Sequence, residues 1–310
     1  MANIAYHYTT INGFYSIVKD KLLLLTSLRN MNDPSEGGYS VDTFMADYKE
    51  IESQYGSKYP FLTVLKEQAE QHQKDFQEVC NMPTEPYSTC FSRKRDSLSH
   101  WERYSQGMTG ICIGFDLDEL YGINLQLFEA FSLKEISYDK ESRKNRIFEG
   151  LKKYYEQIKQ NTKEPDDNKI CDILKIKGYT HLAATYQSIL YFVKDNYWNE
   201  EAEIRLLYDD CSWNNKIRLF KQIEETWKIK ITDKAEQWHD LSGLANKEFV
   251  NFSTIRSCRY LNLEEDWSSK LIPEIIIGPF SRQNSSELND FIVDSGLKET
   301  KVLKSEIKIR

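Results

Sequence analysis

Three short segments, far apart in the chain, hold the residue types best suited to chemistry. They are Tyr6–Thr10, which contains a histidine, Cys90–Tyr104, which is rich in aromatic and hydroxyl side chains, and Glu201–Arg205, which contains two glutamates. Each segment places rare or costly polar side chains on or beside a stretch that has the pattern of a buried strand. We therefore expect the three segments to meet in one site.

The pair Glu201 and Glu203 is the sharpest of these features. On a strand, residues two apart point to the same face, so both carboxylates and Arg205 are expected to project together. Cleavage of the N-glycosidic bond of NAD passes through an oxocarbenium-like state. One carboxylate held near the ribose would stabilise that charge, and the second would orient or deprotonate the acceptor. The alternative is an exposed edge strand with a solvated Glu/Arg pair.

The first segment is expected to bind the ribose side of the same ligand. His7 on a first strand can donate a hydrogen bond to a ribose hydroxyl, with Tyr8 and Thr9 beside it and Thr9 capping a turn. A strand that leads at once into a helix can wrap a nucleotide. The alternative is a half-buried histidine whose ring is satisfied by backbone.

The middle segment is expected to line a pocket for the nicotinamide ring. Ser92 ends a strand, and Trp101 and Tyr104 lie three apart on one helix face, where their rings could stack on a flat ligand. Ordinary core packing of the two rings is the alternative. Arg29 or Arg205 is expected to pair with the carboxylates or with a phosphate.

Hydrophobic periodicity predicts one α+β domain over residues 1–310, with helical insertions near 40–80 and 140–192. Thr10 is expected to cap the first helix, and Pro60 to break the first insertion. The expected strands are 4–8, 22–26, 87–92, 110–116, 135–138, 201–208, one near 229, 249–253, 272–278 and 302–309. The expected helices are 12–19, those of 40–79, 98–104, 140–159, 170–191 and 285–295.

Composition excludes several classes of function. The chain has 310 residues and a formal net charge of −7, so no global basic surface indicates nucleic-acid binding. Arg93-Lys94-Arg95 is the best local candidate for a basic groove, although a solvated loop is the more common role of such a triplet. The histidines and cysteines lack metal-ligand spacing, so no metal is expected. We find neither a signal pattern nor an apolar run long enough to span a bilayer, and we expect a cytoplasmic protein without membrane contact.

Several sequence blocks resemble a known bacterial family, the one catalogued as domain of unknown function 2971. The matching blocks occur in the family's order and touch nearly the whole chain. They are HYTT-x-NGFYSIVK-x-KLLL, RNMNDPSE, CFS-x3-DSLSHW-x2-Y-x4-TGICIGFD, W-x2-EAEIRLL and IPEIIIGP.

The block layout also resembles the ADP-ribosyltransferase fold, which implies a split pair of curved antiparallel sheets with NAD, as substrate, in the cleft between them. By this resemblance His7 takes the position of the histidine that binds the adenosine-side ribose. Tyr104 would be the second nicotinamide-stacking tyrosine, with Phe91 in place of the first. Glu203 matches the late catalytic glutamate, and Glu201 the first glutamate of arginine-modifying members. The glycine that follows the histidine in that fold is absent.

The resemblance implies a transferase that acts on a macromolecular acceptor, protein or nucleic acid, in phage defence or as a toxin, and leaves room for a cognate inhibitor. An acidic net charge argues against long duplex DNA as a tight partner. Three alternatives stay open: an NAD glycohydrolase, a non-catalytic nucleotide-binding or antitoxin-like module, and a metal-dependent nuclease. The nuclease would use four scattered carboxylates: Asp33, Glu36, Asp96 and Glu203.

Overall fold

The structure of the protein is a computed structural model that combines helices with a large open mixed sheet. It describes residues 2–28, 38–82, 86–120, 131–161, 167–176, 178–209, 247–251, 254–264 and 266–308. The chain divides into two compact units. Unit 1 consists of 1–31, 84–135 and 200–310, and unit 2 of 32–83 and 136–199. The helical stretches that the sequence suggests as insertions lie in unit 2.

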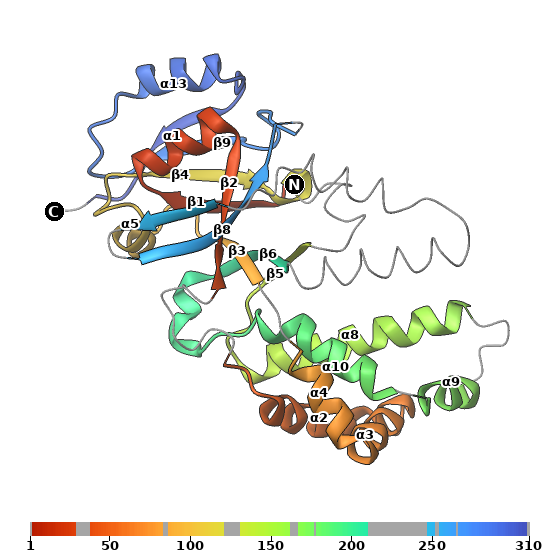
Figure 1. The fold of residues 1–310 in the computed structure, drawn as a ribbon. Helices are drawn as coiled ribbons and strands as arrows, with labels where there is room; N and C mark the ends of the chain where they lie inside the picture. Colours follow the sequence, from red (N-terminus) through yellow and green to blue (C-terminus); the bar gives the residue numbers. More distant parts are fainter. Residues whose placement is uncertain are drawn as a thin grey trace. The chain divides into compact units, whose positions relative to one another are not determined.

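Unit 1 is built on the sheet (Figure 1). Its ten strands follow the order β10-β9-β4-β1-β3-β2-β8-β7, with β6 paired to β3 and β5 paired to β6. Among the described strands, β9 and β10 pair in parallel and the other pairings are antiparallel, so the sheet is mixed. The strands are β1 (Ile4–Thr9), β2 (Leu22–Ser27), β3 (Pro86–Ser92), β4 (Ile111–Asp116), β5 (Phe131–Glu135), β6 (Glu203–Asp209), β7 (Lys247–Asn251), β8 (Thr254–Asn262), β9 (Glu274–Ile277) and β10 (Lys301–Lys304).

Strand β3 joins the parts of this sheet. It pairs with β6 along its whole length, from Pro86 to Ser92. Its other edge is therefore divided between β1, which reaches it at Ser92, and β2, which reaches it at Tyr87 and Ser88. The expected pair of separate sheets is thus replaced, among the described strands, by one branched sheet in which β1 and β2 diverge from a shared neighbour.

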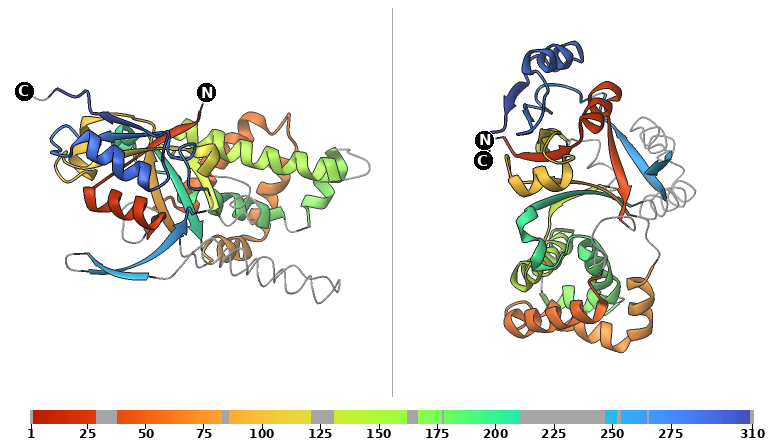
Figure 2. Two further views of the ribbon diagram at one scale, coloured as in Figure 1. Left: turned by 90° about the horizontal axis from the view of Figure 1, so that it is seen from above. Right: turned by 90° about the vertical axis from the view of Figure 1, so that its left-hand side faces the viewer.

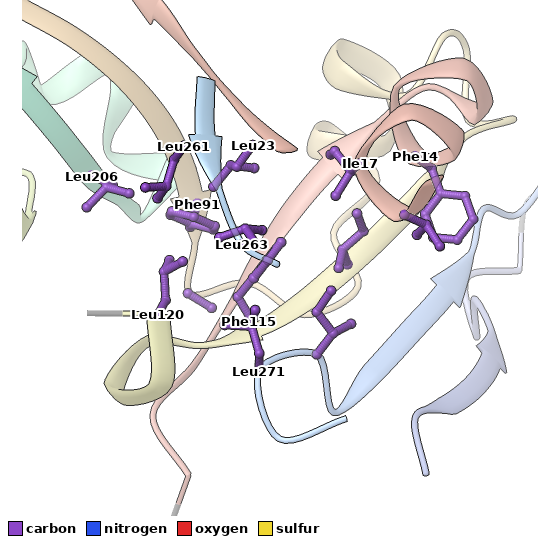
Figure 3. Packing of buried hydrophobic residues seen from close by; sticks show 14 of the residues in the cluster. Phe14, Ile17, Leu23, Phe91, Phe115, Leu120, Leu206, Leu261, Leu263 and Leu271 are labelled. Atoms are coloured by element: carbon purple, nitrogen blue, oxygen red, sulfur yellow. The ribbon is translucent and has the colours of Figure 1, made fainter. Parts of the chain in front are cut away.

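One face of the sheet is covered by α1 (Ile11–Asp20) and α13 (Ser285–Asp294), whose buried residues pack with alternate residues of the strands (Figures 1 and 2). Phe91, Phe115 and Leu206 belong to this apolar core, with Phe14 and Ile17 of α1 (Figure 3). We call this the α1 face. Burial of such side chains from two elements is the main stabilising contribution to the unit.

The opposite face carries α5 (Leu98–Tyr104), and we call it the α5 face. Here Trp101 packs with Tyr6, Tyr8, Cys112 and Ile276. These strand residues alternate with those of the α1 face because successive strand side chains point to opposite sides. A short helix, α6 (Leu117–Leu120), follows β4 and adds its buried leucines to the apolar core.

Unit 2 is helical. Its core includes Phe44, Tyr48, Leu65, Ile147 and Leu182. The ion pair between Arg143 and Asp47, 3.2 Å from Nε to Oδ2, lies inside this unit, and Asp47 is buried. The helices are α2 (Val41–Tyr55), α3 (Phe61–Gln71), α4 (Gln73–Cys80), α8 (Lys140–Asn161), α9 (Asp167–Leu174) and α10 (Gly178–Leu190).

Most predicted elements are present, and the differences have local causes. Thr10 caps α1 as expected, since its side chain accepts a hydrogen bond from the Gly13 N–H at 3.0 Å. The long helix expected over 170–191 is two helices, with Gly178, a poor residue for a helix interior, at the start of the second. The strand expected at 135–138 lies earlier, at Phe131–Glu135, where it pairs with β6. The strand expected near 229 lies outside the described residues.

Candidate functional site

The strongest cluster of buried polar side chains lies on the α5 face, where β6 begins. The 3₁₀ helix η2 (Asn196–Glu201) ends there, and β6 starts at Glu203. The register places Ser92 opposite Glu203 and Cys90 opposite Arg205. Ser92, Glu203 and Arg205 therefore share one face of the sheet, as residues directly opposite each other do.

A backbone kink at Ala202 separates the two glutamates. Ala202 has φ of 42°, a left-handed conformation that is costly for a residue with a Cβ. The Glu201 carbonyl accepts hydrogen bonds from Ser92 Oγ at 2.7 Å and from the His100 ring, and the Ala202 carbonyl accepts from the Arg93 N–H at 3.0 Å. These bonds hold the kink. The expectation of a continuous strand from Glu201 was therefore wrong, because the strand begins only after the kink.

Glu203 forms a buried ion pair with Arg205. Nε and Nη2 of Arg205 both donate to Oε1 of Glu203, at 2.8 and 2.7 Å. The side chain of Glu203 is only 4% exposed and that of Arg205 only 1% exposed. This strand is not a solvated edge, because β6 lies between β3 and β5. The structure thus gives Arg205 one of the carboxylate partners expected for it.

Glu201 is buried as well, but its side chain faces helix α5. The Tyr104 hydroxyl donates a short hydrogen bond to Glu201 Oε1, and Nη1 of Arg103 lies 3.7 Å from the same oxygen. The Glu201 side chain is 6% exposed, whereas that of Arg103 is 48% exposed. The two carboxylates are thus close in sequence but contact different partners: a buried guanidinium for Glu203, and two α5 side chains for Glu201.

His100 also belongs to this cluster, although the sequence did not single it out. Its Nε2 lies 3.1 Å from the Glu201 carbonyl and its Nδ1 lies 2.9 Å from Ser97 Oγ. A carbonyl only accepts, so Nε2 carries the proton and Nδ1 accepts from the serine hydroxyl. Burial lowers the pKa of His100, which favours this neutral form. The signal that could have revealed it was its place one helical turn before Tyr104.

His7 lies on the opposite side of the sheet from this cluster. Tyr6 is opposite Ser92 in register and shares the α5 face, so His7, one residue later, points to the α1 face. Its ring contacts Phe91, a member of the apolar core, with 5.9 Å between ring centroids. The structure therefore does not bring His7 together with Glu201 and Glu203 on one face.

The hydrogen bond made by His7 also reverses its expected role. Nδ1 lies 2.9 Å from the Cys90 carbonyl, so Nδ1 carries the proton and donates it to backbone. Burial lowers the pKa of His7, which keeps the ring neutral. The remaining nitrogen, Nε2, can accept a hydrogen bond from a ligand hydroxyl but cannot donate one.

Tyr8, Thr9 and Trp101 occupy structural positions. The Tyr8 hydroxyl donates to the Lys94 carbonyl at 2.7 Å and accepts from the Ser97 N–H at 3.0 Å. Trp101 is 0% exposed, and its indole N–H donates to Asp96 at 2.6 Å. Thr9 ends β1, directly before Thr10, which caps the helix as expected. Of the two aromatic side chains expected beside nicotinamide, Tyr104 is the one that contacts a candidate carboxylate.

Each member of the Arg93-Lys94-Arg95 triplet is paired with a carboxylate. Nε of Arg93 lies 3.0 Å from Glu135, Nζ of Lys94 lies 2.5 Å from Glu200, and Nε of Arg95 lies 2.9 Å from Glu274. The three partners belong to different parts of unit 1, so the triplet ties those parts to the end of β3. Because its charge is compensated, the triplet does not form a basic groove.

Other expected site residues cannot be placed. Arg29, Asp33 and Glu36 lie outside the described residues. Within the described part of the chain, no three His, Cys, Asp or Glu side chains are arranged to hold a metal ion. None of the helices in that part has both the length and the apolar character needed to cross a bilayer.

Comparison with known proteins supports one resemblance. No curated protein and no solved structure matches the chain. Residues 100–206 match the model of a family described as a protein of unknown function (DUF2971). The matched range begins in α5 and ends in β6, so it includes Tyr104, Glu201 and Glu203. Across this range, which holds the two glutamates of the candidate site, the chain is similar to the DUF2971 family.

Proposed function

We propose that the protein is an NAD-dependent ADP-ribosyltransferase with a divergent, branched form of the ADP-ribosyltransferase sheet, and that it modifies a macromolecular acceptor. The observation that carries the proposal is the kinked Glu201-Ala202-Glu203 segment, which holds two buried carboxylates against different partners. Groups whose surroundings differ in this way are suited to separate tasks in a reaction.

The chemistry follows from the charge that develops on the ribose. Breaking the bond to nicotinamide leaves an oxocarbenium-like ribosyl group, and a fixed carboxylate on the same side stabilises it. Arg103, half exposed beside Glu201, is suited to a phosphate because its planar guanidinium donates several parallel hydrogen bonds. Tyr104 supplies the aromatic surface next to the carboxylate.

His7 is not required by this proposal because it lies on the α1 face. Its Nε2 would accept a hydrogen bond from the ligand only if the ligand reaches beyond the α5 face to the α1 side of the sheet. The variant His7→Gln therefore separates two versions of the site: a lower NAD affinity in the variant supports an extended site, and an unchanged affinity supports a site confined to the α5 face.

The test is incubation of the purified protein with NAD labelled on the adenylate phosphate, together with a cell lysate. Nicotinamide release and transfer of label to macromolecules are followed in parallel. The double variant Glu201→Gln/Glu203→Gln is expected to lose both signals, whereas Glu200→Gln, an adjacent exposed control, keeps them. Absence of release and of NAD binding in the wild-type protein would overturn the proposal.

A glycohydrolase is the second candidate, and the burial of the site favours it. Side chains that are only 4–6% exposed admit water more readily than a side chain of another macromolecule. On this reading water takes the ribosyl group. Nicotinamide release without label transfer, at any lysate concentration, would select the glycohydrolase over the transferase.

A further inference from the structure

We infer that the two carboxylates have different tasks: Glu201 contacts the ribosyl group, while Glu203 is a structural residue that forms a buried ion pair with Arg205. This assignment rests on the proposed function. It differs from the assignment implied by the sequence resemblance, in which Glu203 is the catalytic glutamate, and it follows from the contacts that each side chain makes.

Glu203 is tied to its partner. Both donors of Arg205 bind one of its oxygens, and the two side chains are almost completely buried. Separating them would leave a buried charge without compensation, which is strongly unfavourable. A guanidinium at this distance also offsets much of the field that Glu203 would exert on a developing cation. Glu203 is therefore poorly suited to stabilise a ribosyl cation.

One partner of Glu201, Arg103, is exposed and can move. Tyr104 and Arg103 both belong to α5, and the Arg103 side chain is 48% exposed. The 3.7 Å between Arg103 and Glu201 is longer than a hydrogen bond. Rotation of an exposed arginine toward solvent or toward a ligand phosphate opens the way to Glu201 without disturbing the core. A cationic ligand group can then approach the carboxylate.

The main chain around Glu201 is held in place. Its carbonyl is bound by Ser92 and by His100, and the next carbonyl is bound by the Arg93 N–H. These contacts come from β3, from α5 and from the loop between them. The fixed main chain limits how far the Glu201 side chain can shift, so little reorganisation is needed as charge develops, which is the condition for strong electrostatic stabilisation.

The reaction at this site is a substitution at the ribose C1′. The bond from C1′ to the nicotinamide nitrogen breaks, and its electron pair leaves with nicotinamide, which becomes neutral. Glu201 stabilises the resulting ribosyl cation. A lone pair of the acceptor forms the new bond to C1′, and the acceptor's proton passes to the Glu201 carboxylate and then to water.

The experiment compares single variants by nicotinamide release from NAD and by thermal unfolding. Glu201→Gln is expected to lower kcat by about 100-fold or more, with the KM for NAD changed less than about threefold. Its Tm should stay within about 2 °C of wild type because the Gln amide oxygen can still accept the Tyr104 hydrogen bond and no buried guanidinium loses its counter-charge. Glu203→Gln is expected to lower Tm by about 10 °C, since it removes the negative charge from the buried ion pair with Arg205, and to keep kcat within about tenfold.

Two further variants keep the test decisive. If Glu203→Gln does not fold, Glu203→Leu/Arg205→Met removes both charges together and is expected to fold and to release nicotinamide within about tenfold of wild type. Tyr104→Phe is expected to lower kcat about tenfold through loss of its hydrogen bond to Glu201. Glu200→Gln is the matched control and should resemble wild type in both measurements.

The outcomes are distinguishable. A folded Glu203 variant that is inactive, beside an active Glu201→Gln, overturns the assignment while the proposed function stands. Equal loss of kcat in both single variants, with unchanged Tm, also overturns it. A wild-type protein that neither binds nor cleaves NAD overturns the proposed function, and the assignment with it.

Discussion

The two faces of the sheet around β3 and β6 are built from the same strands but stabilised in different ways. On the α1 face, Phe91 and Ile204 pack in a large apolar core. On the α5 face, the next residues along the same strands are Ser92, Glu203 and Arg205, and all three are buried. The stability of the α1 face comes from close packing of apolar side chains. The stability of the α5 face comes from hydrogen bonds and ion pairs between its buried polar groups.

This difference indicates which face of the sheet can hold polar side chains in a fixed geometry. A packing face tolerates replacement by another apolar side chain of similar volume. A buried polar face does not tolerate loss of a single partner, because the group left behind has been removed from water without compensation. The α5 face therefore holds its side chains in fixed geometry, which a reaction requires, and the α1 face supports it from behind.

The largest effect is expected from breaking the buried ion pair. Arg205→Met removes the positive charge from the buried ion pair with Glu203 and should lower the free energy of unfolding by about 3–5 kcal/mol. Glu203→Leu/Arg205→Met should recover most of this loss because no charge remains buried. Urea unfolding of the single and double variants measures both values. If the double variant is as unstable as the single one, the packing of these two side chains, and not their charge, determines the loss of stability.

A smaller effect is expected at Ser92. Its hydroxyl donates to the Glu201 carbonyl and accepts from the Lys94 N–H at 3.0 Å, so Ser92→Ala removes two hydrogen bonds. The expected loss of stability is about 1–3 kcal/mol. Ser88→Ala is the matched control: Ser88 is buried on the same strand and face, but its hydroxyl donates only at 3.4 Å. Equal losses in the two variants would contradict the special role of Ser92.

The histidine of the α1 face should make stability depend on pH. Burial lowers the pKa of His7 below its ordinary value of 6.5, so His7 binds a proton more readily in the unfolded chain than in the folded protein. Stability is therefore complete above pH 6.5 and falls as the pH drops below that value, by at most about 1.4 kcal/mol for each pH unit. His7→Gln should flatten this slope between pH 7 and pH 5 in denaturant unfolding. His100→Gln gives the corresponding measurement for the α5 face. If the slope of unfolding free energy against pH is unchanged in His7→Gln, His7 is not the cause of the pH dependence.

The smallest effect is expected for an exposed ion pair of the α5 face. Nε and Nη2 of Arg95 donate to the two Glu274 oxygens at 2.9 and 3.1 Å, but the Arg95 side chain is 42% exposed. Arg95→Gln should therefore cost only about 0.2–1 kcal/mol, and less in high salt. Unfolding at low and at high ionic strength checks this. A loss as large as that of Arg205→Met would mean that polarity alone, without burial, explains the sensitivity of this face.

Much of the fold could be predicted because local signals were strong. Thr10 before an amphipathic stretch marked the start of α1, and the apolar run near Ile113 marked a central strand. Helix α5 has the predicted bounds, Leu98 to Tyr104. The branching of the sheet at β3 had no local signal, since it depends on which strands pair over long sequence distances. The kink at Ala202 had none either, because alternation alone predicts a straight strand through Glu201.

The sequence by itself determined which residue types are available for chemistry and which elements carry them. Glutamates flanking Ala202, an aromatic helix and a histidine on the first strand are all readable there. Only the tertiary structure decided their grouping. Strand alternation, set by the register of Tyr6 with Ser92, sends His7 to one face and the glutamates to the other. The left-handed Ala202 turns Glu201 toward Tyr104 and leaves Glu203 with Arg205, because long-range hydrogen bonds from Ser92, His100 and Arg93 outweigh the local cost of that conformation.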